Sequence, residues 1–87
     1  MKLNKEEKDI LINWGNSKED LLQIENLKYK FTLIEDTKET KITMKKAKEE
    51  LGDTLFLSGI ERAAFHGTAF RSINDNKGIY IKSNLFN

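Results

Sequence analysis

Eighty-seven residues, with fifteen basic and fourteen acidic side chains, are enough for one domain with a thin hydrophobic core. The lack of cysteine excludes disulfides and thiolate metal sites, and a single histidine excludes a histidine-rich metal site, so we expect no metal and no cofactor. A net charge of +1 argues against both a nucleic-acid mimic and a general polyanion binder.

The sequence shows no sign of a membrane span or a secretory leader. No apolar run approaches the ~18 residues that a span needs. The first seven residues include four charged side chains and lead directly into a helical pattern. We therefore expect a complete, soluble gene product that stays in the cytoplasm.

Two short helices are predicted at the N-terminus. Asn4 can cap the first, and Glu7 three residues later completes a capping-box pattern. Gly15 offers a left-handed stop, after which Ser17 can cap the second helix. Trp14 is the largest apolar side chain, and we expect it in the interface between helices and sheet.

The hydrophobic period changes to two after Lys28. Residues 29–33 alternate as a half-buried strand does, and residues 41–42 can form a short return strand after a polar loop at 35–39. This predicts a β-hairpin in which Lys30 lies on the face opposite Tyr29 and Phe31.

Residues 28–48 also form a basic segment, with seven lysines against three carboxylates. Such a segment favours either a solvated surface or a patch that binds nucleic acid. The second interpretation is weakened because the aromatic side chains of the strand lie opposite its lysines, and no RNP, KH or zinc-finger pattern is present. The candidate nucleic-acid residues are Lys41, Lys45, Lys46 and Lys48.

A third helix is predicted from a Thr43 cap to a stop at Gly52, and a fourth ends at Gly67. A second capping-box pattern, Ser58 to Glu61, leaves open whether the fourth helix runs through or restarts there. The small residues of this segment favour close approach to the sheet, with a flat face for another macromolecule as the alternative. These small residues are Ser58, Gly59, Ala63, Ala64 and Gly67.

Residues 68–73 and 79–82 predict a second hairpin with a polar turn at 74–78. The elements therefore run α-α-β-β-α-α-β-β. Paired helices and strands favour a single α+β domain over 1–87, with about four short antiparallel strands in two hairpins packed with three to four helices.

The segment before the second hairpin concentrates the residues able to do chemistry. Ser58 and His66 lie eight residues apart, about 12 Å along one helix, which is too far for a hydrogen bond. Arg62 and His66 share a helix face and Arg71 follows, an arrangement that suits an anion, a partner or metal-free phosphodiester cleavage. The alternative is a purely structural role, in which His66 interacts with the dipole at the helix C-terminus and Arg62 pairs with nearby carboxylates.

Residues 57–66, with the sequence LSGIERAAFH, and the hairpin that follows resemble a segment of short uncharacterised proteins from low-GC Gram-positive bacteria and their phages. Small phage and mobile-element proteins of this kind are often inhibitors or regulators of a host protein, including anti-CRISPR and other anti-defence proteins. The resemblance thus implies a phage-type inhibitor and gives no functional residues.

We therefore predict a non-enzymatic module that binds a host or viral protein, with Lys45, Lys46 and Lys48 as a secondary electrostatic contribution. A small nucleic-acid-binding regulator using the lysine patch is the alternative, and a metal-independent nuclease using His66 and Arg62 is the third. The predicted contact residues are Arg62, Phe65, His66, Phe70 and Arg71.

Overall fold

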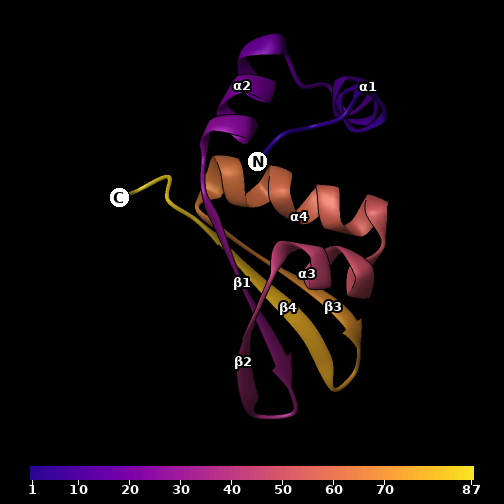
Figure 1. The fold of residues 1–87 in the computed structure, drawn as a ribbon, viewed down its shortest axis with the longest axis vertical. Coiled ribbons are helices and arrows are strands. Elements are labelled where there is room, and N and C mark those ends of the chain that lie inside the picture. The colour runs from indigo at the N-terminus through magenta and orange to yellow at the C-terminus, as the bar shows by residue number, and fades with distance from the viewer.

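The computed structural model describes residues 1–87 and shows the α+β architecture that the sequence predicts, with all four strands in one antiparallel sheet (Figure 1). None of the four helices combines the length and apolar character that crossing a membrane requires. The elements follow in the order α1 (Lys5–Asn13), α2 (Lys18–Asn26), β1 (Tyr29–Glu35), β2 (Lys38–Ile42), α3 (Met44–Leu51), α4 (Asp53–His66), β3 (Thr68–Asn74) and β4 (Lys77–Ser83).

The predicted caps fix where the first three helices begin. The Asn4 side-chain oxygen accepts a hydrogen bond from the backbone N–H of Glu7 at 2.8 Å. In return, the Glu7 carboxylate accepts one from the backbone N–H of Asn4 at 2.9 Å. Ser17 forms the equivalent pair with Asp20, and Thr43 caps α3. Each side chain satisfies an amide that the first turn of a helix leaves without a partner. These three predictions are confirmed.

Helix α4 runs without interruption from Asp53 to His66, so the capping-box interpretation of Ser58 is wrong. The Ser58 hydroxyl donates to the Leu55 carbonyl at 2.8 Å, within the preceding turn, and does not cap a new helix. The helix ends at Gly67, which has a φ of 90°, as the sequence predicts.

The strands lie in the order β2-β1-β4-β3, so each hairpin contributes one central and one edge strand. Both turns have two residues, 36–37 and 75–76, and are shorter than the predicted five-residue loops. The reason is that polar residues at the loop ends still pair across the ladder, as Glu35 does with Lys38. Asp36 adopts a φ of 55°, which aspartate tolerates, and its amide donates to the Asn76 carbonyl at 2.7 Å. This bond links the tips of the two hairpins.

Helices α3 and α4 cover one face of the sheet, and α4 also lies between the sheet and the pair α1 and α2 (Figure 1). The core between the layers is apolar, and the Phe31 and Phe56 rings stack with centroids 5.9 Å apart. The prediction for Trp14 is wrong, because α1 packs on α2 and α4 and does not reach the sheet. Leu11 is the fully buried residue of α1, whereas Trp14 at its C-terminus is 39% exposed.

Candidate functional site

The close approach of α4 to the sheet positions the candidate site. A Cβ atom on Gly59 would lie 2.6 Å from the Ile81 Cδ1 atom, so a larger residue fits at this contact only if the Ile81 side chain moves. Ala63 and Ala64 are fully buried on the same helix. For Gly59 the interpretation as a means of close packing is therefore confirmed, and this packing brings α4 within hydrogen-bond reach of β3.

A cleft of about 360 Å³ opens beside this contact, between α4, β3 and the segment joining α1 to α2. Four of the five predicted contact residues line it together: Arg62, Phe65, His66 and Arg71. Asn16, Ser58 and Glu61 complete the lining. The i, i+4 spacing of Arg62 and His66 puts both on the solvent side of α4, as predicted, and both are exposed.

Arg71 is held in place by neutral oxygen atoms. Its Nε donates to the Ser58 hydroxyl at 2.9 Å, its Nη2 to the Ser58 carbonyl at 3.1 Å, and its Nη1 to the Phe70 carbonyl at 3.0 Å. A guanidinium carries five N–H groups, so two remain for a ligand. The side chain is thus oriented before any ligand binds, and no carboxylate of the chain neutralises its positive charge.

Neither arginine of the chain forms an ion pair, since all three salt bridges involve lysine. Arg62 pairs with neither Glu61 nor Asp53, contrary to the structural alternative that the sequence offered. The Glu61 carboxylate instead accepts a hydrogen bond from Asn16 Nδ2, which also donates to the Leu11 carbonyl. The cleft therefore holds two unpaired guanidinium groups against one carboxylate that is already engaged.

His66 and Ser58 line the same cleft without a hydrogen bond between them, because Ser58 bonds Leu55 and Arg71 instead. Their separation along a continuous helix is about 12 Å, as predicted. No group of three or more histidine, aspartate or glutamate side chains is arranged to hold a metal ion.

Phe70, the fifth predicted contact residue, does not line the cleft with the other four. Neighbouring residues of a strand point to opposite faces, so Arg71 faces α4 while Phe70 lies on the far side of the sheet. There its ring occupies the space that a Cβ on Gly78 would take, and the side chain is 50% exposed.

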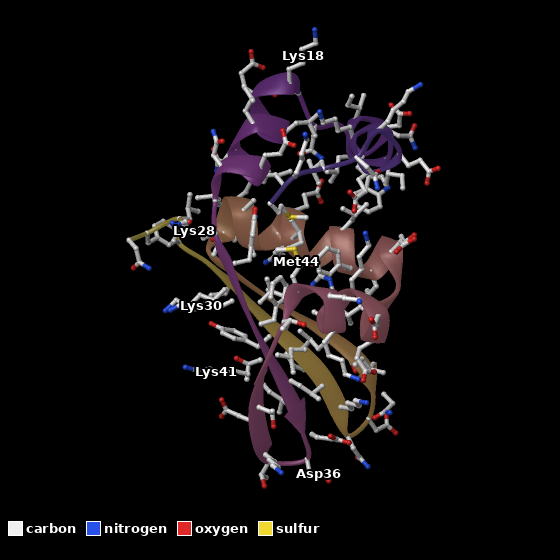
Figure 2. All side chains as sticks on the ribbon, viewed as in Figure 1. Lys18, Lys28, Lys30, Asp36, Lys41 and Met44 are labelled. Atoms are coloured by element: carbon white, nitrogen blue, oxygen red, sulfur yellow. The ribbon has the colours of Figure 1, made fainter.

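The predicted lysine patch is divided. Lys46 pairs with Glu50 at 3.4 Å and Lys48 pairs with Glu7 at 3.1 Å, so two of its four charges are compensated. Lys45 is exposed on α3 without an ion pair, and Lys41 lies on the face of β2 that points away from the helices. Figure 2 shows Lys41 extending from the flank of the sheet, on the same side as Lys28 and Lys30.

Sequence reasoning missed Lys82 and Tyr80, which the sheet register brings beside Lys30 and Phe70. The signal was present in β4, where these two side chains alternate with the buried Ile79 and Ile81. The pairing of β4 with β1 could not be read from that alternation.

No family model matches the chain, and no curated protein or solved structure matches it.

Proposed function

We propose that this protein is a non-enzymatic binding module whose cleft between α4 and β3 receives an acidic side chain from the surface of a partner protein. The observation that carries the proposal is that Arg62 and Arg71 line one cleft and that neither has a carboxylate partner in the chain. Planar guanidinium groups recognise carboxylates through paired hydrogen bonds, and arginine is enriched at protein interfaces.

The remaining residues of the cleft suit such a contact. Arg71 is already oriented by Ser58, so little side-chain entropy is lost when it binds. Phe65 is half-buried and adds apolar area, and the exposed His66 ring adds a hydrogen-bond donor. The resemblance of residues 57–66 to phage proteins supports a host protein as the partner, with inhibition of an anti-phage defence such as CRISPR as the proposed role.

The lysine patch on α3 has less support as an alternative nucleic-acid site, because Lys46 and Lys48 are paired with carboxylates. The cleft could also accommodate a phosphodiester between Arg62 and His66, which is the arrangement that a metal-independent nuclease would use. The experiment must therefore distinguish cleavage of RNA from binding alone.

The test is capture of partners from lysate of the native host by the immobilised protein, followed by affinity measurement with the purified partner. Arg62→Ala is the informative variant because Arg62 makes no side-chain hydrogen bond or ion pair in the chain, so the fold should be unaffected. Arg71→Lys keeps the charge but loses the planar fork. Lys18→Ala, at the far end of α2 (Figure 2), is the matched control.

We expect one protein to bind the wild type and the Lys18→Ala variant and to be lost from both arginine variants. An identical set of proteins on the wild type and on Arg62→Ala would contradict the proposal. RNA cleavage that is abolished by His66→Ala with the fold intact would replace it with the nuclease.

A further inference from the structure

One face of the sheet is covered by no helix. Helices α3 and α4 contact the strands from the side that carries Phe31, Ile79 and Ile81. Side chains of a strand alternate between faces, so the register defines what lies on the other side. We call this surface the open face. Its central residues are Lys30, Thr32, Lys41, Phe70, Tyr80 and Lys82.

The open face is basic at one end. Lys30 lies directly opposite Lys82, and Lys41 lies opposite Thr32 on the next strand. All three lysines are exposed and none takes part in a salt bridge. Glu39 is the one carboxylate whose strand register places it on this face, and it lies toward the hairpin turns. Figure 2 shows Lys30 and Lys41 extending away from α3 and α4.

Two aromatic side chains lie next to these lysines. Phe70 and Tyr80 are directly paired across β3 and β4, a geometry that puts their Cβ atoms about 5 Å apart. Phe70 covers Gly78, so its ring lies over the surface of the sheet while half of its area stays open to solvent. Open aromatic faces beside cations are the two elements that a stacking platform needs.

Two clefts follow the lysines. A cleft of about 450 Å³ is lined by Tyr80, Lys30, Lys41 and Lys82, together with apolar atoms of Ile42 and Met44. A second, of about 310 Å³, is lined by Lys28, Lys30, Lys82 and polar residues of the C-terminal segment. Lys30 and Lys82 belong to both, so the clefts form one basic track along β1 and β4 that ends at Tyr80, whose strand partner is Phe70.

We infer that the open face binds single-stranded nucleic acid, with phosphates on Lys30, Lys41 and Lys82 and bases stacked on Tyr80 and Phe70. Lysine is depleted from protein interfaces, and these unpaired charges favour a polyanion over a protein surface. Stacking requires bases that are free of a duplex, which favours a single strand over a double helix.

Fluorescence anisotropy with labelled twelve-nucleotide single strands, in RNA and DNA form, at ~50 mM salt tests this inference. Lys30→Ala and Lys82→Ala should each weaken binding to all sequences and reduce the slope of log affinity against log salt by about 0.7. Tyr80→Thr, which replaces the ring with another residue that favours a strand, should weaken binding about tenfold, and Tyr80→Phe should retain it. Lys18→Ala is the control for a lysine outside the open face.

Binding of either sugar form with these losses supports the inference, and the tighter form identifies the natural strand. No binding at ~50 mM salt would overturn it. A loss of affinity in Lys18→Ala equal to that in Lys30→Ala would also overturn it, and so would equal affinity for a duplex of the same length. Either result would mean that binding reflects general charge attraction alone. Circular dichroism of every variant confirms that the fold is retained.

Discussion

Arg71 donates two hydrogen bonds to Ser58, one from Nε to the hydroxyl at 2.9 Å and one from Nη2 to the carbonyl at 3.1 Å. The contact joins β3 to α4 directly, beside the glycine at which the helix approaches the sheet. The orientation of the charge in the cleft therefore depends on a helical serine for which the sequence pattern leaves open a role as a cap.

Ser58→Ala should free the Arg71 Nε–H while leaving the fold nearly as stable, since the bonds from Nη1 and Nη2 go to backbone carbonyls and remain. The lost hydroxyl contact costs about 1 kcal/mol, and the higher helix propensity of alanine returns about 0.5 kcal/mol. We expect faster solvent exchange of the Arg71 Nε–H by NMR and weaker binding of the captured partner. Thr54→Ala, on an exposed position of the same helix, is the control and should change neither. An unchanged Arg71 exchange rate would show that Ser58 does not orient it.

Gly59→Ala should destabilise the fold although alanine favours a helix. Overpacking against Ile81 costs about 1–3 kcal/mol, and the propensity gain is about 1 kcal/mol. Ile81→Val removes the clashing methyl group, so the double variant should be more stable than the sum of the single losses predicts. Urea unfolding of all four proteins measures this coupling, and strict additivity would contradict the close contact.

Gly67→Ala should destabilise the fold in part through a contact with Phe86. Gly67 and Gly52 both have a positive φ, of 90° and 81°, so alanine carries a backbone penalty of about 1 kcal/mol or more at either position. A Cβ on Gly67 would also lie 2.7 Å from the Phe86 ring, whereas nothing lies within 4 Å of one on Gly52. Thermal unfolding should show that Phe86→Ala reduces the loss caused by Gly67→Ala and leaves the loss caused by Gly52→Ala unchanged. A Gly67→Ala loss that Phe86→Ala does not alter would mean that Phe86 does not pack on the turn.

Glu50 should make stability depend on acidity. Hydrogen bonds from Lys77 and Lys46 lower the pKa of Glu50 from its ordinary value of 4.5. Its ionised form therefore stabilises the folded state above pH 4.5, and this contribution is lost as the pH falls through the lowered pKa. Glu50→Gln should be less stable than the wild type at pH 7, and the gap should close in acid.

Glu49→Gln is the matched control for that titration, because its exposed carboxylate lies next in sequence and forms no ion pair. It should follow the wild type at every pH. A gap between Glu50→Gln and the wild type that persists in acid would assign the effect to packing instead of charge.

The elements that the sequence predicts well are those decided within a few residues. The caps at Asn4, Ser17 and Thr43 and the stop at Gly67 depend on side chains that bond their own turn or on a local φ. The order of elements, and hence the α+β class, follows from these signals. The grouping of Arg62 with His66 also follows, because it needs only the helical period.

The predictions that are wrong concern residues whose position depends on contacts distant in the sequence. Ser58 could not be assigned because its partner, Arg71, lies thirteen positions away. Trp14 was placed by size alone, whereas the path of α1 leaves it at the surface. Phe70 is different, since the sequence alone is enough to separate it from Arg71. The two residues are adjacent in a strand, so their side chains lie on opposite faces of the sheet.

The strand order has a consequence for synthesis. The first hairpin forms its inner ladder with β4, and β4 leaves the ribosome after every other element of the domain. Until then the backbone edge of β1 has no neighbour on that side, and such an edge invites pairing with other chains. Nascent chains should therefore depend on chaperones, or on dilute conditions, until β4 emerges.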